Sequence, residues 1–233
     1  MIVAYAATRN LYDDLRPAIA SLLTYNKPEK VYIVIEDDEL PFNVPDVCEI
    51  VNVSGQTWIT PGGPNWNTPF TPMVMIRICY EYYLPATVKK VLQLDVDTIV
   101  LEGLAPLFNI DLGDAWAAMV NEREGAYKPF GPDYFNCGVT LFDLEKMRRE
   151  KITDQLVGLI NTRKMRFTEQ DAINTVGEGR IYELPTRYNE CFATGRTEKP
   201  AIVHFAGSGK FEDPRRELIR VFRSPPLQKI FDG

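Results

Sequence analysis

The first 35 residues alternate between extended and helical patterns, which limits the folds that are open to this chain. Residues 2–6 form a short apolar run that predicts a buried strand, and the β-branched run 31–35 predicts another. Between them, apolar residues recur at helical spacing from Leu15 to Leu23, after a helix start near Asp13. A strand, a helix and a strand in this order predict an α/β fold with a parallel sheet, whose ligand crevice lies at the carboxyl ends of the strands.

The same patterns predict further elements along the chain. Strands are expected over residues 47–53, 88–94, 116–120, 138–144 and 201–205, and helices over 72–84, over 144–160 with a break inside, and over 168–176 with Thr168 as the N-cap. The stretch 56–72, rich in proline and glycine, predicts a long loop that is either functional or mobile. The tail 211–233 predicts a helix that packs on the main body through Leu218, Ile219 and Phe222.

Charge and composition narrow the class of protein. The net charge of −6 argues against a nucleic-acid binder, which would normally carry a basic face. The cysteines Cys48, Cys79, Cys137 and Cys191 lack metal-site spacing, so they are expected to be reduced thiols in a cytoplasmic protein. The chain has neither an apolar run of about 18 residues nor a basic leader, so we expect no membrane span, and peripheral membrane contact at most.

Asp95, Val96 and Asp97 follow directly on the apolar run 88–94. If this segment stays extended, both carboxylates emerge on one side while Val96 points into the packing. Two carboxylates that converge at a strand end form half of a site for a hard cation, of the kind that holds magnesium or manganese against phosphates. The pattern occurs by chance in acidic chains, so its meaning depends on the motifs around it.

Five further segments offer polar groups. Residues 6–10 follow the first predicted strand, Arg77 lies on the helix before Asp95, and Asn136 is expected in a turn that enters a strand. Glu169-Gln170 lies at a helix start, and residues 204–210 follow a buried strand. An arginine binds phosphate or orients a carboxylate, and an amide both donates and accepts hydrogen bonds. Glycines near Lys210 let the backbone approach a ligand closely. Residues 6–10 lack G-x-G-x-x-G, which disfavours a dinucleotide-binding fold.

In this order, D-x-D, F-N-x-G-V, [DE]-Q and H-F-x-G-x-x-K resemble the motifs of the retaining family 8 glycosyltransferases, which include glycogenin and the bacterial lipopolysaccharide galactosyltransferases. The resemblance extends from Ile2 to Lys210. It implies a single GT-A type domain over residues 1–233, with a Rossmann-like, mainly parallel central sheet flanked by helices. Residues 1–100 would form the nucleotide-sugar-binding half, 101–210 the acceptor and catalytic half, and 211–233 a C-terminal helical tail.

The resemblance also implies roles for individual residues. Asp95, Asp97 and His204 would bind the metal, with Mn²⁺ expected and Mg²⁺ as the alternative. The nucleotide-sugar would contact Ala6, Thr8, Asn10, Arg77, Asp95, Val96, Asp97, Gly207 and Lys210, and Glu169, Gln170 and Asn136 would be the catalytic groups. The chain departs from the family's pattern in two places: Thr8 stands where many relatives have an acidic residue, and Phe211-Glu212 replaces the usual proline-tryptophan after the lysine.

The resemblance thus implies the metal-dependent transfer of a hexose from a UDP-sugar to a hydroxyl acceptor, expected to be a glycan. The metal and Lys210 would stabilise charge on the departing UDP, and a carboxylate such as Glu169 would stabilise the oxocarbenium-like state. Two mechanisms stay open, covalent attack by Glu169 and entry of the acceptor on the leaving-group side. Formation of a homodimer also stays open.

Two other functions remain alternatives. A nucleotidyltransferase that forms a nucleotide-sugar would be expected to carry a Gly-rich triphosphate loop, which residues 6–10 lack. A non-catalytic module that binds a UDP-sugar or a glycan on the same fold would not need the complete set of Asp95, Asp97, His204 and Lys210.

Overall fold

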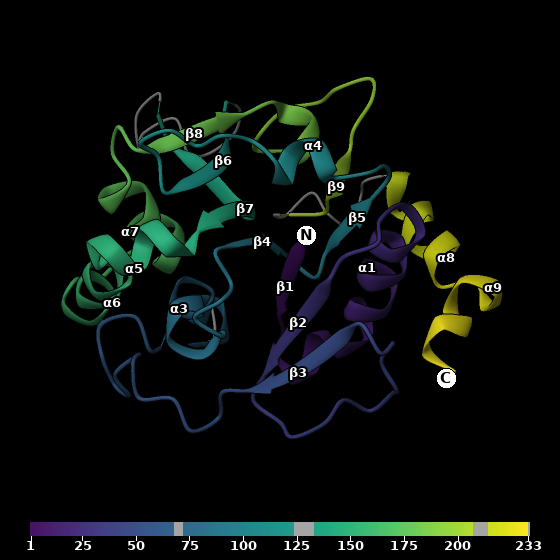
Figure 1. Ribbon diagram of the computed structural model, residues 1–233, viewed down its shortest axis with the longest axis horizontal. Coiled ribbons are helices and arrows are strands. Elements are labelled where there is room, and N and C mark those ends of the chain that lie inside the picture. The colour runs from purple at the N-terminus through teal and green to yellow at the C-terminus, as the bar shows by residue number, and fades with distance from the viewer. Residues whose placement is uncertain (68–71, 124–132, 207–213, 233) are drawn as a thin grey trace.

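A twisted sheet forms the centre of the protein, as the computed structural model in Figure 1 shows. The structure describes residues 1–67, 72–123, 133–206 and 214–232. Within these ranges, seven strands form a sheet in the order β3-β2-β1-β4-β7-β6-β8, and β5 pairs with β9 in a separate small sheet. The strands are β1 (Ile2–Ala6), β2 (Lys30–Ile35), β3 (Cys48–Asn52), β4 (Lys90–Leu94), β5 (Thr98–Val100), β6 (Ala117–Asn121), β7 (Phe135–Asp143), β8 (Ile181–Leu184) and β9 (Ile202–His204).

The direction of the strands confirms the predicted α/β class. β1 pairs in parallel with β2 and β4, β2 pairs in parallel with β3, and β6 pairs in parallel with β8. β7 runs antiparallel to both of its neighbours, β4 and β6. The central sheet is therefore mainly parallel, and β7 is the exception among the described strands of this sheet.

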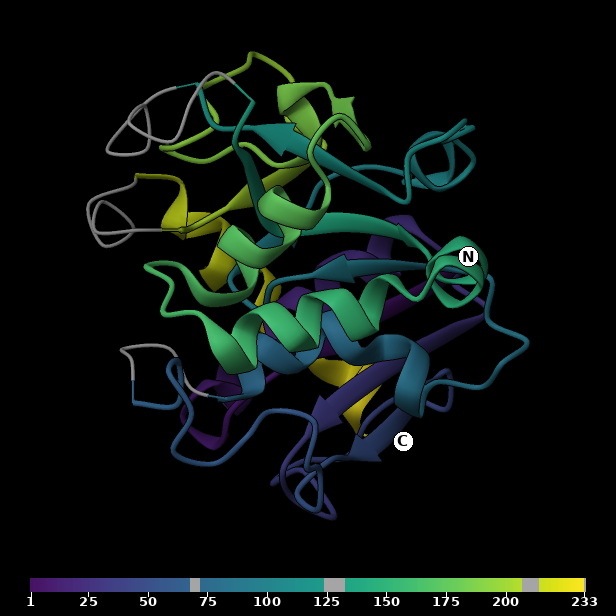
Figure 2. The same ribbon diagram turned by 90° about the vertical axis from the view of Figure 1, so that its left-hand side faces the viewer.

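Helices cover both faces of this sheet (Figures 1 and 2). One face carries α1 (Tyr12–Tyr25) with the C-terminal α8 (Glu217–Phe222) and α9 (Pro225–Gln228) beside it. The other face carries α2 (Pro72–Ile76), α3 (Tyr80–Tyr83), α5 (Leu144–Glu150), α6 (Ile152–Thr162) and α7 (Thr168–Val176), while the short α4 (Ala105–Phe108) follows β5.

Alternate residues of the strands feed the two apolar layers. On β1, Val3 and Tyr5 pack in the layer that contains Leu15 of α1, whereas Ala4 packs in the opposite layer with Met75 of α2. Successive side chains of a strand point to opposite faces, so a strand covered on both sides must be apolar throughout. This explains why residues 2–6 and 31–35 read as continuous apolar runs.

The helix predicted over 72–84 is interrupted. α2 is followed by a 3₁₀ turn over Arg77–Cys79 and then by α3. The 3₁₀ turn begins at Arg77, whose Nε donates to the carbonyl of Val74 at 3.1 Å. The predicted end is confirmed: Leu84 is extended (φ −85°, ψ 148°), because the following Pro85 disfavours helical geometry at the preceding residue.

Two local predictions near the site were wrong. β7 begins at Phe135 rather than at residue 138, so Asn136 lies inside a strand and not in a turn. Thr168 is the first residue of α7, with φ 37°, and does not act as its N-cap. Instead, the Asp171 carboxylate accepts hydrogen bonds from the backbone N–H of Arg166 and Phe167, at 2.9 and 3.0 Å, and so satisfies this helix start.

The break predicted between residues 144 and 160 and the packing of the tail are confirmed. Lys151 separates α5 from α6 in the left-handed conformation, with φ 54°. In the tail, Phe222 and Phe231 are buried against the α1 layer. The guanidinium of Arg16 lies 5.3 Å from the ring centroid of Phe231, a cation–π contact that adds to the docking of the tail.

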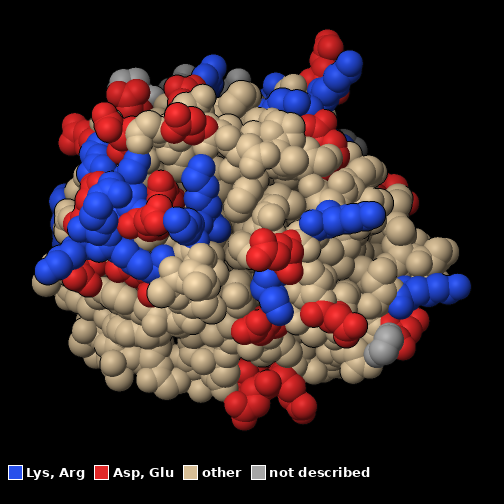
Figure 3. All heavy atoms as spheres, in the orientation of Figure 1, with Lys and Arg blue, Asp and Glu red and all other residues tan. Residues whose placement is uncertain are grey.

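The surface carries charges of both signs. On the face in Figure 3, basic side chains gather at the left, where Figure 1 places α5 and α6, with acidic side chains among them. Glu150 pairs there with Arg149 at 2.8 Å and with Arg180 at 2.6 Å. Acidic side chains within this basic patch therefore neutralise part of its charge. Across the described ranges, no helix combines the length and apolar character that a membrane crossing requires.

Candidate active site

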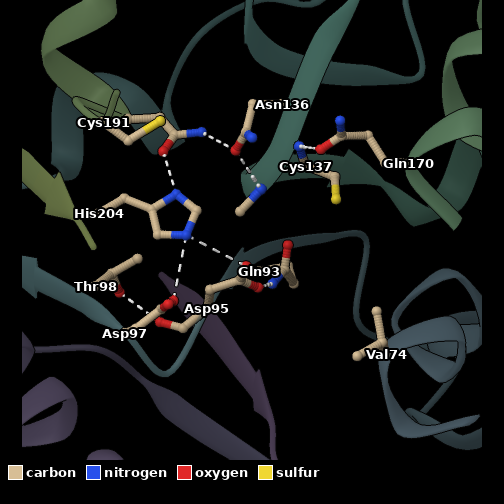
Figure 4. A network of polar contacts seen from close by, with 12 residues as sticks. Val74, Gln93, Asp95, Asp97, Thr98, Asn136, Cys137, Gln170, Cys191 and His204 are labelled. Carbon is tan, nitrogen blue, oxygen red and sulfur yellow. Dashed lines mark hydrogen bonds and ion pairs between the residues drawn. The ribbon is translucent and has the colours of Figure 1, made fainter. Parts of the chain in front are cut away.

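Asp95, Asp97 and His204 meet at the carboxyl end of β4. The small sheet brings them together, since β5 pairs with β9 so that Thr98 lies opposite His204. The Nε2 atom of His204 lies 3.2 Å from Oδ1 of Asp97 and 3.5 Å from Oδ2 of Asp95 (Figure 4). One ligand atom from each of the three residues lies within 4.8 Å of the others, which is the spacing of groups that can share one cation.

The segment that carries the two aspartates is a turn and not the predicted extended chain. Thr98 closes this turn, because its backbone N–H and its Oγ1 both donate to the carbonyl of Asp95, at 3.1 and 2.6 Å. Val96 is buried, as expected. The turn still leaves both carboxylates facing His204, so the convergence was predicted correctly although the backbone conformation was not.

The electrostatics of this cluster favour a bound cation. Burial opposes the charged form of His204, but the Asp97 carboxylate and the Cys191 side chain together outweigh it and raise the pKa of His204 to about 9. Two carboxylate oxygens and one imidazole nitrogen are a donor set that Mn²⁺ accepts, and that Mg²⁺ accepts with less preference for the nitrogen. The residues present therefore fit the expected metal.

Arg77 links the aspartates to the acidic residue of α7. Its Nη1 donates to Oδ1 of Asp95, and its Nη2 donates to Oε1 of Glu169. Burial acts against the guanidinium charge, yet Glu169 keeps the pKa of Arg77 above its ordinary value. Glu169 is itself only 2% exposed, so the ion pair forms a buried bridge between the cluster of Asp95, Asp97 and His204 and helix α7.

Glu122 is a site residue that the sequence analysis missed. Its Oε1 accepts hydrogen bonds from Asn136 Nδ2 at 2.8 Å and from Gln170 Nε2 at 3.1 Å. Its Oε2 is buried and has no hydrogen-bond partner among the described residues. Burial raises the pKa of Glu122, although both amides act to lower it. The sequence did contain a signal for Glu122, because it follows the predicted strand 116–120 and ligands bind at the carboxyl ends of strands in α/β sheets.

Asn189 was also missed. It is fully buried, and its Oδ1 lies 2.8 Å from Nδ1 of His204, while its Nδ2 donates to Oδ1 of Asn136 at 2.8 Å. Asn189 follows a 3₁₀ turn over Thr186–Tyr188, in a segment with no pattern that marks a site.

The structure gathers all of the described candidate residues around one cavity of about 480 Å³. Its lining includes Ala6, Thr8, Asn10, Arg77, Asp95, Val96, Asp97, Asn136, Glu169, Gln170 and His204, together with the unpredicted Glu122. The predicted phosphate contacts Gly207 and Lys210 lie outside the described residues. A hollow of about 790 Å³ between α7 and β8 contains none of the predicted residues, so the chemistry points to the smaller cavity.

The carboxyl ends of β1 and β2 form a hollow of about 570 Å³ beside this cavity, lined by Thr8, Arg9, Asn10, Glu36 and Asp37. Thr8 Oγ1 donates to Oδ1 of Asn10 at 2.6 Å. Asp37 binds Arg9 Nε at 3.2 Å and the Tyr12 hydroxyl at 2.7 Å, which fixes the far wall. The hollow lies next to the switch point between β1 and β4, at the carboxyl edge of the sheet where α/β proteins bind nucleotides.

Solved structures show which fold the chain has. A galactosyltransferase LgtC, crystallised in complex with donor and acceptor sugar analogs, aligns with a TM-score of 0.78 and 22% identity over 100% of this chain and 97% of its own. The glycosyltransferase GlyE of Streptococcus pneumoniae aligns with a TM-score of 0.73 and 20% identity, over 99% of this chain and 62% of its own. These likenesses show the predicted GT-A fold.

Sequence comparison shows the family. The model for glycosyl transferase family 8 matches residues 64–211, and the chain therefore belongs to this family. General stress protein A of Bacillus subtilis is 28% identical over 53% of this chain and 53% of its own length. Lipopolysaccharide 1,2-glucosyltransferase of Escherichia coli K12 is 24% identical over 54% and 45%. The chain thus spans about half the length of these curated relatives, or less.

Proposed function

We propose that this protein is a metal-dependent retaining glycosyltransferase that transfers a hexose from a UDP-sugar to a hydroxyl acceptor, with a glycan as the acceptor. The observation that carries the proposal is the meeting of Asp95, Asp97 and His204 in one cavity with Arg77 and Glu169. Family membership supports it, as do the donor and acceptor sugar analogs bound in the LgtC structure.

In this proposal Asp95, Asp97 and His204 hold Mn²⁺, with Mg²⁺ as the alternative. When bound, the ion neutralises the diphosphate and so stabilises UDP as a leaving group. The carboxylates of Asp95 and Asp97 would supply the negative charge that binds it, and the buried imidazole of His204 would supply a nitrogen ligand. Arg77 holds the Oδ1 atom of Asp95, which restricts the rotation of this ligand.

The uridine would lie over the carboxyl ends of β1 and β2, against Ala6, Thr8 and Asn10. The Thr8 hydroxyl and the Asn10 amide offer both donors and acceptors to a base or ribose. Gly207 and Lys210 remain the proposed diphosphate contacts.

Glu169 is the residue that we assign to the oxocarbenium-like state. Its Oε1 accepts hydrogen bonds from Arg77 and, at 3.4 Å, from the Cys137 thiol, and its Oε2 accepts one from Thr168. These donors fix the carboxylate in the cavity wall, where its charge would stabilise positive charge on the sugar ring. The unpartnered Oε2 of Glu122 would accept a sugar hydroxyl.

Gln170 is assigned a positioning role. Its Nε2 donates to Glu122, and its Oε1 accepts the backbone N–H of Cys137 at 3.1 Å. Both ends of the amide are thus engaged within the protein. The residue holds α7 against β7, so that the neighbouring Glu169 keeps its place.

The test is the release of UDP from a panel of UDP-hexoses, with and without Mn²⁺ and with simple sugars as acceptors. The proposal expects release from at least one donor, and expects it to require the ion. If the folded protein releases no UDP from any donor, the proposal is contradicted. Pyrophosphate formation from UTP and a hexose phosphate would instead favour the nucleotidyltransferase alternative.

A further inference from the structure

A chain of three hydrogen bonds leads from the wall of the cavity to the imidazole. Glu122 Oε1 accepts from Asn136 Nδ2, Asn136 Oδ1 accepts from Asn189 Nδ2, and Asn189 Oδ1 lies 2.8 Å from His204 Nδ1. All of these side chains are at least nine-tenths buried. Water is thus largely excluded as an alternative partner.

The donor and acceptor of each bond can be assigned from neighbouring groups that can only donate or only accept. The backbone N–H of Gly138 can only donate, and it lies 3.0 Å from Asn136 Oδ1. Glu122 Oε1 receives two amide N–H groups, from Asn136 and Gln170, so it acts as an acceptor. These two contacts orient the Asn136 amide with its oxygen toward Asn189.

The orientation of Asn136 then determines that of Asn189. Asn189 must turn its NH₂ group toward the Asn136 oxygen, so its own oxygen faces His204. An amide oxygen accepts, so Nδ1 of His204 carries a proton, and the Nε2 lone pair of a neutral imidazole faces Asp95 and Asp97.

We propose that Asn136 and Asn189 form an amide relay that fixes the proton of neutral His204 on Nδ1 and thereby keeps Nε2 available to the metal. Asn189 is then a positioning residue of the metal site. An Asn189 amide turned by half a rotation would aim its NH₂ group at Nδ1 and require the proton on Nε2, where it would block the ion. The inference rests on the proposed function, because it takes the Asp95, Asp97 and His204 cluster as the metal site.

Two substitutions at position 189 test the relay by Mn²⁺ titration in the absence of any sugar donor. Asn189→Leu removes the amide acceptor from Nδ1–H and leaves the weakly accepting Cys191 side chain beside the imidazole. The expected loss of Mn²⁺ affinity is about 10–100-fold, as for other partners of ligating histidines. Asn189→Asp keeps an oxygen opposite Nδ1, although it loses the N–H that Asn189 donates to Asn136, so affinity should stay well above that of Asn189→Leu. Equal affinity of Asn189→Leu and wild type would overturn the relay.

The relay also predicts coupling between its two amides. Asn136→Leu lets the Asn189 amide turn, so it should weaken Mn²⁺ binding in the wild-type background. In the Asn189→Asp background the same substitution should have no effect, because a carboxylate has no NH₂ end to present to His204. An equal loss in both backgrounds would overturn the relay. Asn174→Leu is the matched control, since the Asn174 amide binds backbone groups of Phe135 and Gln170 and lies outside the relay.

A spectroscopic readout separates the relay from a general loss of structure. His204 is the single histidine of the chain, so its ring gives one set of ¹⁵N-imidazole NMR signals. With diamagnetic Zn²⁺ in place of Mn²⁺, the Nδ1–H signal should be protected from exchange in the wild type and in Asn189→Asp, and lost in Asn189→Leu. A protonated Nε2 in the metal-loaded wild type would overturn the relay. If the wild type binds no metal at all, the proposed metal site fails first and the relay falls with it.

Discussion

Gly138 and His204 lie so close together that a side chain on one would displace the other. A Cβ atom at position 138 would lie 2.1 Å from Cε1 of the His204 ring and 2.5 Å from Nδ1. The glycine of the F-N-x-G-V motif is therefore required by the approach of the imidazole to β7, and not by an unusual backbone conformation.

Gly138→Ala should consequently disable the metal site while leaving the sheet intact. The ring must move away from Asp95 and Asp97, so Mn²⁺ affinity should fall by tenfold or more, and overpacking should cost about 1–3 kcal/mol of unfolding free energy. Mn²⁺ titration and thermal melting measure the two effects. The control is Gly158→Ala on α6, where an added Cβ meets nothing within 4 Å and both properties should be retained. Unchanged metal binding in Gly138→Ala would contradict the geometry.

The buried bridge between Arg77 and Glu169 should dominate the stability of the site. Arg77→Met leaves the Glu169 carboxylate buried without its charged partner, and the expected cost is about 3–5 kcal/mol in urea denaturation of the metal-free protein. The double variant Arg77→Met/Glu169→Gln should recover a large part of this loss. Arg220→Met, which removes an exposed pair with Glu217, should change stability little. Equal losses in the single and double variants would argue against the bridge.

Glu122 should make the stability of the metal-free protein depend on pH. Burial raises its pKa, so folding disfavours the ionised form, and stability falls as pH rises from the ordinary carboxyl value of about 4.3 through the raised one. Glu122→Gln cannot ionise. Its melting temperature should therefore exceed that of the wild type at pH 7, and the difference should shrink towards pH 4. A difference in melting temperature that does not vary with pH would show that burial does not disfavour the ionised form of Glu122.

The three residues of the cluster could be predicted from the sequence, but the strand pairing that brings them together could not. Each of these residues, Asp95, Asp97 and His204, lies at the end of an apolar run, in a motif that can be recognised from its immediate neighbours in sequence. They meet because β5 pairs with β9, and strands of three residues are too short to show a period of two. The expected extended segment at Asp95 is a turn for a related reason, since Thr98 donates to the Asp95 carbonyl and local pattern does not reveal such bonds.

The hydrogen-bond roles of Glu122 and Asn189 could not be predicted from the sequence, although the position of Glu122 after a predicted strand marked it as a candidate. Glu122 lies 14 residues from Asn136 in sequence, and Asn189 lies 53 residues from it. Their roles depend on the direction of hydrogen bonds between distant segments, which no local spacing encodes. The central sheet was predictable because a strand covered on both faces must be apolar, whereas a buried polar network is visible only when its partners are in place.

The central claim is that Asp97 and its neighbours bind a divalent ion that in turn binds the nucleotide. The most direct measurement is calorimetric titration of UDP into the wild type and into Asp97→Asn, each with and without Mn²⁺, with circular dichroism to confirm that both are folded. We expect Mn²⁺ to strengthen UDP binding at least tenfold in the wild type and to have little effect in Asp97→Asn. The same Mn²⁺-dependent affinity in both proteins would contradict the account.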